Sequence, residues 1–369
     1  MRKLLAAAAL AGGFVVAAGA AQAADPLKVC FVYVGPHNDG GYSQMHDIGR
    51  KAVDKEFGDK VDASTYLENV PEADSEGQIR GLAQNGCGLI FTTSFGFMDA
   101  TVKVASEFPD VKFEHATGFK AADNLSTYNT RWYEGRYVMG QIAGKMSKKG
   151  LAGYVVPVWI PEVVMGMDAF MLGAQSINPD FKIKFIATGS WFDPGKEADA
   201  ANTLINQGAD VIVQHTDSPA PMQAAEKAGV YGMGQAADMS AFGPKAHLAS
   251  LIDTWSPYYI ARTKAVLDGT WKSQQVWLGL KDGLLEVGPL TNMPDDVKST
   301  VIADLKNGTK LTSFTPHPDV TDAEVKGNGT QELTFFIDTT GPDVKFEVGN
   351  TLNTADVKPY DPTRIDRSL

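Results

Sequence analysis

Strand-like apolar runs alternate with segments of helical periodicity along most of the chain, and this alternation occurs twice. Consecutive parallel strands need a crossover connection, which is usually a helix. The pattern therefore predicts an α/β protein with two doubly wound lobes, each a sheet covered by helices on both faces. The strand-like runs lie at 28–34, 61–67, 88–93 and 111–115 in the first lobe and at 153–158, 183–187, 210–215 and 230–234 in the second.

Two segments indicate where the chain passes between the lobes. Residues 120–133 are polar and aromatic without sustained periodicity, and we interpret them as the first crossing. The run 247–252 leads through Asp253-Thr254-Trp255 into a helix predicted over 257–267, which indicates the return crossing. We predict a first lobe from 24–128 and 253–285, a second lobe from 129–252 and 286–318, and a peripheral C-terminal extension, a hairpin or a tail, over 319–369.

The first 23 residues have the pattern of a secretory signal peptide. Arg2 and Lys3 precede an apolar stretch over 4–16, and Ala21-Gln22-Ala23 is the small-x-small pattern of a cleavage site. The apolar stretch is shorter than the ~20 residues that a membrane span needs. A lipoprotein would carry a Cys at the cleavage point, whereas the first Cys is Cys30. We therefore predict a soluble protein of the periplasm that is not a lipoprotein.

The charge of the chain excludes several classes of partner. The formal net charge is −11, and removal of residues 1–23, which carry two positive charges, changes it to −13. Nucleic-acid binding needs clustered Lys and Arg, and no such run occurs. The same balance argues against attraction to a membrane surface.

Candidate binding residues follow the predicted strands. Ligands of open parallel sheets bind beyond the carboxyl ends of the strands, so the loops after each strand are the place to look. These loops are rich in aromatic and acidic side chains. The candidates are Asn38, Asp39, Tyr42, Ser94, Phe95, Trp159, Trp191, Asp217, Asp238, Asp253 and Trp255.

The chemistry of these candidates favours a small, polar, planar ligand. Aromatic faces stack on planar rings, and carboxylates accept hydrogen bonds from N–H or O–H groups, so the set suits an aromatic base or a sugar. Only Lys120 and Arg131, both near the first crossing, come close as cations, which disfavours nucleotides and amino acids. An alternative for each aromatic is lobe packing, and a strand-end carboxylate such as Asp39 can instead cap the next helix.

Sequence motifs of catalysis are absent. The chain has no G-x-G-x-x-G, no G-x-x-x-x-G-K-[ST] and no G-x-S-x-G, and its six His are scattered without metal-binding spacing. We therefore expect no enzyme activity, no cofactor and no metal.

Cys30 and Cys87 lie near the starts of the first and third predicted strands. These strands are neighbours in a sheet of order 2-1-3-4-5, about 4.8 Å apart, which is within reach of a disulfide. The alternative is two buried free thiols.

Seven segments resemble the basic membrane protein family of ABC-transporter solute-binding proteins, which includes purine nucleoside and adenine binders. The resemblance as a whole extends from residue 28 to about residue 294. The segments are FVYVGPHNDGGY (31–42), FTTSFGFM (91–98), FEHATG (113–118), YEGRYVMGQIAG (133–144), SWFDPGKEAD (190–199), QGADVIVQHTDSPAP (207–221) and GQAADM (234–239).

The resemblance implies a type I periplasmic-binding fold, whose two lobes are joined by three strands and close around the ligand. It also implies that Tyr42 stacks on the base, with Asn38 and Asp39 beside it and Phe95 facing the cleft. Asp217, Asp238 and Trp255 would close the other side.

The chain departs from the family pattern after Phe314, and we find no Lys matching the one that nucleoside binders use toward the ribose, which favours a bare base. The expected function is therefore periplasmic binding of an adenine-like purine base or a nucleoside by a monomer that serves an ABC permease. A sugar-binding protein of the same fold and a secreted nucleoside hydrolase are the alternatives.

Overall fold

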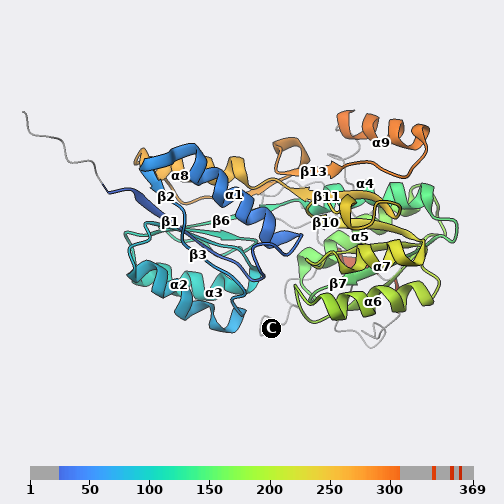
Figure 1. Cartoon of the computed structure of the whole chain (residues 1–369), viewed down its shortest axis with the longest axis horizontal. Coiled ribbons are helices and arrows are strands. Elements are labelled where there is room, and N and C mark those ends of the chain that lie inside the picture. Colours follow the sequence, from blue (N-terminus) through green and yellow to red (C-terminus); the bar gives the residue numbers. More distant parts are fainter. Residues whose placement is uncertain (1–24, 308–334, 338–349, 353–356, 360–369) are drawn as a thin grey trace, which may run out of the picture.

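The computed structural model describes residues 25–307, 335–337, 350–352 and 357–359, and it confirms the α/β architecture of two lobes (Figure 1). The sheet of the first lobe has the strand order β12-β6-β5-β4-β1-β2, with β3 also paired to β1. Every pairing in it is parallel. Its strands are β1 (Leu27–Val32), β2 (Val61–Asp62), β3 (Tyr66–Leu67), β4 (Leu89–Thr92), β5 (Lys112–Ala116), β6 (Leu125–Thr130) and β12 (Gln275–Leu278).

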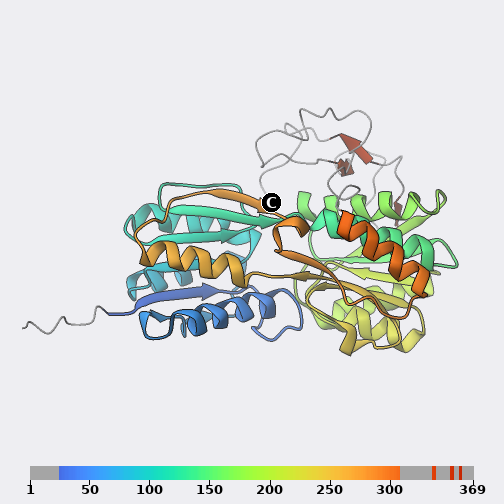
Figure 2. The same cartoon turned by 90° about the horizontal axis from the view of Figure 1, so that it is seen from above.

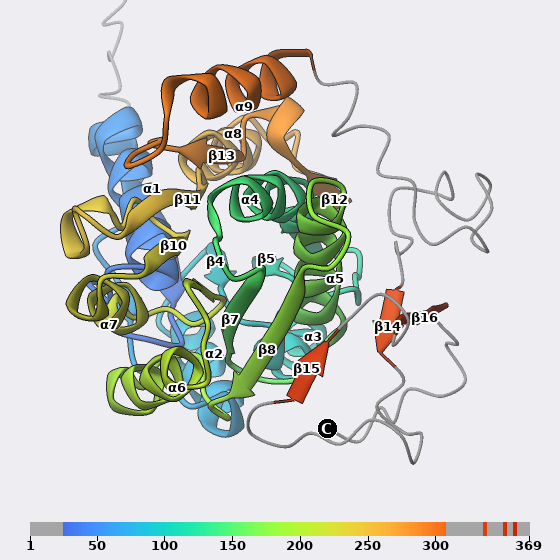
Figure 3. The ribbon, with the colours of Figure 1, turned by 90° about the vertical axis from the view of Figure 1, so that its right-hand side faces the viewer.

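The sheet of the second lobe has the order β13-β11-β10-β9-β7-β8-β15. Its centre is parallel, and the two outermost strands, β13 and β15, pair antiparallel with their neighbours. Strand β15 extends the edge of β8 (Figure 3). The strands are β7 (Leu151–Val156), β8 (Lys182–Ala187), β9 (Val211–Gln214), β10 (Tyr231–Ala236), β11 (His247–Asp253), β13 (Leu285–Gly288) and β15 (Asn350–Leu352).

Helices cover both faces of each sheet, as Figure 1 shows for the first lobe, with α1 and α8 on one face and α2 and α3 on the other. Helices α4 and α5 lie so close together that only glycine fits at position 140, since a Cβ there would lie 2.0 Å from the Phe170 carbonyl oxygen. The helices are α1 (Tyr42–Phe57), α2 (Ser75–Gln84), α3 (Met98–Glu107), α4 (Trp132–Met146), α5 (Pro161–Gln175), α6 (Pro194–Asn206), α7 (Ala220–Ala228), α8 (Ser256–Leu267) and α9 (Asp295–Asn307).

The interpretation of 120–133 as an irregular crossing is wrong over 125–130, because β6 occupies these residues. Its sequence, LSTYNT, lacks a continuous apolar run. Its Ser126, Thr127 and Thr130 side chains are nevertheless buried, and some of their polar atoms have hydrogen-bond partners within the lobe. The Ser126 hydroxyl oxygen, for example, accepts from Nη2 of Arg262 at 2.9 Å and from the Gln274 amide at 3.1 Å.

The chain passes between the lobes three times, after β6, after β11, and between β12 and β13 (Figure 2). We take these crossings as the lobe boundaries. The predicted signal peptide over 1–23 lies outside the described residues, as does most of the extension over 319–369. Within that extension, β14 (Phe335–Ile337) pairs antiparallel with β16 (Val357–Pro359).

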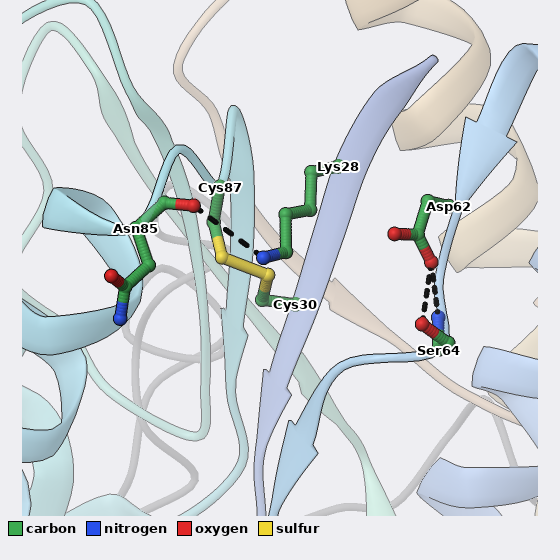
Figure 4. Close-up of a disulfide and its surroundings, with 6 residues drawn as sticks. All are labelled: Lys28, Cys30, Asp62, Ser64, Asn85 and Cys87. Carbon is green, nitrogen blue, oxygen red and sulfur yellow. Dashed lines mark hydrogen bonds between the residues drawn. A yellow bond between two sulfur atoms is a disulfide. The ribbon is translucent and has the colours of Figure 1, made fainter.

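Cys30 and Cys87 form a disulfide, with their Cα atoms 6.0 Å apart (Figure 4). Cys30 lies in β1 and Cys87 lies two residues before the neighbouring strand β4. Both side chains are buried in the same apolar cluster of the first lobe. The bond therefore ties the start of β4 to the middle of β1.

Candidate functional site

A cleft lies between the two lobes, at the carboxyl ends of their strands. It contains about 330 Å³ of space free of protein atoms, part of which is open to solvent. The rule for open parallel sheets therefore locates this site correctly. The cleft is lined by Val34, Tyr42, Ser94, Phe95, Thr117, Trp132, Glu162, Trp191, His215, Asp217 and Gln235.

Five of the residues proposed from the sequence meet in this cleft: Tyr42, Ser94, Phe95, Trp191 and Asp217. The first three come from the first lobe, after β1 and β4, and the last two come from the second lobe, after β8 and β9. Aromatic rings thus reach the space from both lobes. A planar ligand placed there would have ring faces or edges on both sides.

The Tyr42 ring is held in place by aromatic neighbours. Tyr42 is the first residue of α1, and its ring meets His46 edge-on at a centroid distance of 4.3 Å. His46 in turn stacks on Trp255, at 4.7 Å and an interplanar angle of 13°. Because His46 and Trp255 are buried, they support the Tyr42 ring from behind. This packing fixes the ring before a ligand arrives.

Glu72 joins the two lobes across the mouth of the cleft. Its Oε1 atom accepts hydrogen bonds from the Ser94 hydroxyl at 2.6 Å, the Gly96 amide at 3.1 Å and the Trp191 indole N–H at 3.2 Å. Ser94 and Gly96 belong to the first lobe, whereas Trp191 belongs to the second. The Ser94 hydroxyl and the Trp191 indole N–H therefore bind Glu72. The face of the Trp191 ring is still available to stack on a ligand.

The first loop also presses directly on the second lobe. A Cβ at Gly41 would lie 2.2 Å from the carbonyl oxygen of Asp217, so only glycine fits there. Gly40, at φ +84°, packs against Pro219 and Phe242. These contacts, with the Glu72 bond, define a closed arrangement of the lobes.

The wall from the second lobe is polar and buried. Nε2 of His215 lies 3.8 Å from Oε1 of Glu162, and the Oδ2 atom of Asp217 has no hydrogen-bond partner in the described part of the chain. Burial raises the pKa of Glu162 to about 8 and raises that of Asp217 well above its usual range, where Asp39 and Glu197 add to the effect. Burial and the charge of Arg136 lower the pKa of His215. Glu162 can therefore be protonated at neutral pH, and it can then donate as well as accept a hydrogen bond.

Two proposed residues form a second layer behind the cleft lining. Asp253 is fully buried and accepts a 2.7 Å hydrogen bond from Nε1 of Trp132, which does line the cleft. Burial raises the pKa of Asp253 to about 8. Trp255 packs against His46, as described above. Both residues hold lining side chains in place.

The remaining four proposed residues do not line the cleft. Asp39 caps α1, since its carboxylate accepts from the backbone amides of Gly41 (2.8 Å), Ser43 (2.8 Å) and Gln44 (3.0 Å). Asn38 and Asp238 are exposed, and Asp238 accepts from the Ser240 amide. The Trp159 ring stacks on Phe185, with centroids 5.2 Å apart. None of these four is among the residues that line the cleft.

Sequence reasoning missed six lining residues: Val34, Thr117, Trp132, Glu162, His215 and Gln235. Four of them end or follow strands, and the rule that locates the cleft could have found them. Thr117 follows β5, and Gln235 is near the end of β10. Trp132 and Glu162 lie in the first turns of α4 and α5, where periodicity gives no hint that a side chain turns toward the cleft.

Within the described ranges, no group of three or more His, Cys, Asp or Glu side chains is placed to hold a metal ion. None of the helices in those ranges is both long and apolar enough to cross a membrane.

A two-lobe α/β fold with a cleft at the strand ends is the architecture of periplasmic solute-binding proteins. The family model for the ABC transporter substrate-binding protein PnrA-like (Bmp) matches residues 27–313. The chain belongs to this family. ABC substrate-binding proteins act outside the cytoplasmic membrane and deliver a small molecule to a permease.

Individual proteins agree with this assignment. A purine-binding protein of Brucella abortus is 60% identical over 291 residues, covering 79% of this chain and 83% of its own. A putative ABC transporter glucose-binding protein of Haloferax volcanii is 38% identical, covering 77% and 73%. The crystal structure of an ABC transporter solute-binding protein from Aeropyrum pernix matches the fold with a TM-score of 0.66 at 21% identity, covering 78% of this chain and 87% of the other.

Proposed function

We propose that this protein is a non-catalytic carrier that binds a purine base, adenine-like rather than a nucleoside, in the cleft between its lobes. The observation that carries the proposal is the composition of the cleft. Aromatic rings of Tyr42, Phe95 and Trp191 surround the space, and Glu162 and Asp217 stand beside it. Rings stack on a purine, while the carboxyl groups meet its N–H groups.

One further point supports a purine ligand. The family relative that is 60% identical carries the name of a purine-binding protein. We infer that the closed contacts of Glu72 and Gly41 form when the ligand is enclosed.

The proposal includes export and release into the periplasm. Residues 1–23 would be removed as a signal peptide, and the mature protein would diffuse freely as a monomer. Cys30, the first Cys of the chain, is in a disulfide and is therefore not free for lipidation. The closed form would then dock on an inner-membrane permease.

A sugar remains the second candidate, since the 38% identical relative carries the name of a glucose-binding protein, and aromatic rings with carboxylates also suit pyranoses. Identification of the ligand that co-purifies with the protein distinguishes a purine from a sugar. Purines absorb near 260 nm (on the order of 10⁴ M⁻¹ cm⁻¹) whereas sugars do not. We expect absorbance and mass of a purine after denaturation, and a sugar mass without absorbance would contradict the proposal.

The stacking role is tested with Tyr42→Ala. A stacked base contributes roughly 1–3 kcal/mol, so the variant should bind every purine about tenfold to a hundredfold more weakly. Unchanged affinity would show that Tyr42 does not stack on the ligand. Incubation with nucleosides should release no free base, and release of base would identify an enzyme instead.

A further inference from the structure

A buried arginine lies directly behind the polar wall of the cleft. Arg136, in α4, is fully buried, and its Nη2 donates to Oε1 of Gln235. Its Nε and Nη1 atoms have no hydrogen-bond partner in the described part of the chain. The guanidinium carbon lies 5.5 Å from the centre of the Tyr154 ring, which offers a cation–π contact. Gln235 is thus the partner that fixes this cation in place.

The arginine decides which way the Gln235 amide points. A side-chain amide has one accepting and one donating end, and the two look alike in shape. Arginine carries donors only and remains charged even when burial lowers its pKa, as it does here. Rotation of the amide by 180° would turn N–H groups toward a buried cation. The oxygen of Gln235 must therefore face Arg136.

The consequence appears on the other side of Gln235. Gln235 ends up almost fully buried and lines the cleft. With its oxygen held by Arg136, the group it can offer a ligand is the NH₂ donor. The neighbouring Glu162 and Asp217 offer carboxyl oxygens. The wall therefore contains one amide donor of fixed orientation beside acidic groups.

We propose that Arg136 is a positioning residue that fixes Gln235 as a hydrogen-bond donor to an acceptor atom of the ligand, and that Gln235 thereby determines specificity. The inference rests on the proposed function, since it takes the ligand to be a purine. In an adenine-like base, the acceptor would be a ring nitrogen. A ligand without an acceptor at that place would leave the amide unpaired in a closed cleft, which costs affinity.

Deaza analogues of adenine test the Gln235 part. The 1-, 3- and 7-deaza compounds each replace one ring acceptor by C–H, with little change of shape. By calorimetry, wild type should bind one of them about threefold to tenfold more weakly than adenine through loss of the Gln235 bond. Gln235→Leu should bind that analogue and adenine equally, while its discrimination against the other two is retained. Tyr42→Ala is the matched contrast, because loss of stacking should weaken all four ligands by a similar factor.

Arg136→Met and Arg136→Lys test the positioning part. Arg136→Met frees the amide to turn, so discrimination against the same analogue should shrink toward that of Gln235→Leu, while Arg136→Lys, which keeps a donor to Oε1, should preserve it. If Arg136 had a purely structural role, its substitution would lower the affinity for all four ligands by the same factor and leave the affinity ratios between adenine and its deaza analogues unchanged.

A variant that keeps the arginine covers the case in which Arg136→Met does not fold. In Gln235→Glu the carboxylate pairs with Arg136 and offers the cleft no N–H, so adenine should lose more affinity than the deaza analogue. If the ratio of affinities for adenine and the deaza analogue were the same in wild type, Gln235→Leu and Gln235→Glu, the inference would be overturned. If wild type binds none of the four purines, it is the proposed function that has failed.

Discussion

The indole N–H of Trp191, in the second lobe, donates a 3.2 Å hydrogen bond to Oε1 of Glu72, in the first lobe. The same oxygen atom accepts from the Ser94 hydroxyl, so one carboxylate links residues on both sides of the cleft mouth. A bond that spans the lobes exists only when they are closed. Its energy therefore acts on the balance between the open and closed forms.

Removing this link should speed ligand release. Glu72→Ala loses the cross-lobe bond to a charged acceptor, worth about 1.5 kcal/mol or more, so we expect the dissociation rate to rise about tenfold in stopped-flow measurements. Glu76→Ala is the control, since Glu76 binds Arg80 and Lys103 on the outer surface of the same lobe. Equal dissociation rates for Glu72→Ala and wild type would contradict the closing role.

Asp39 should matter for stability rather than for ligand choice. Because its carboxylate accepts three amide hydrogen bonds at the start of α1, Asp39→Ala should lower the free energy of unfolding by about 1–2 kcal/mol in urea titrations. Asp238→Ala, at an exposed site, should change it by less than about 0.5 kcal/mol. A fully stable Asp39→Ala variant with an altered ranking of purines would instead make Asp39 a ligand contact.

Asp253 and Glu162 should each contribute stability that is lost as pH rises from about 4 to 8. Burial raises the pKa of both carboxyl groups to about 8, against about 4 for exposed carboxyl groups. Between these values each group is protonated in the folded chain and ionised in the unfolded chain, so increasing pH removes its contribution. Burial lowers the pKa of His46, His115, His215 and His247, which act in the opposite direction, so the carboxyl contribution is measured as a difference between variant and wild type.

The variant Asp253→Asn tests the source of this dependence. The slope of its unfolding free energy against pH, between pH 5 and 8, should be more positive than that of wild type by up to about 1.4 kcal/mol per pH unit for the group removed. Asp238→Asn should follow the wild-type slope. Equal slopes for Asp253→Asn and wild type would show that Asp253 is ionised when folded.

The disulfide should stabilise the first lobe. Cys30 and Cys87 are 57 residues apart in sequence, and closing a loop of that order contributes about 2–4 kcal/mol. Cys30→Ala/Cys87→Ala should unfold at lower urea concentration than oxidised wild type and should not respond to reductant. Alkylation of unreduced, denatured wild type should add no label, and two labels by mass spectrometry would mean that both thiols are free.

Much of the fold could be predicted from the sequence because its central strands contain apolar runs, such as LIF (89–91) and VIV (211–213). Strand β6 could not, because its buried Ser126 and Thr127 are stabilised by partners far away in sequence, such as Arg262. Hydrophobic periodicity contains no information about such partners. This is why the sequence of 125–130 resembles an irregular crossing.

The site was predictable to the extent that it follows strand ends. That rule found Tyr42 and Asp217, and it also nominated Asp253 and Trp255, which lie one layer behind the lining. Which side chain of a loop turns inward depends on packing between the lobes. Arg136 was overlooked entirely, since a cation in the middle of a helix resembles a surface residue until its burial is known.

Calorimetric titration of the mature, ligand-stripped protein with adenine and, separately, with glucose tests the central claim most directly. We predict saturable binding of adenine at one site per chain and no heat of binding with glucose. Binding of glucose without binding of any purine would contradict the assignment of the ligand, and it would leave the family and the fold unchanged.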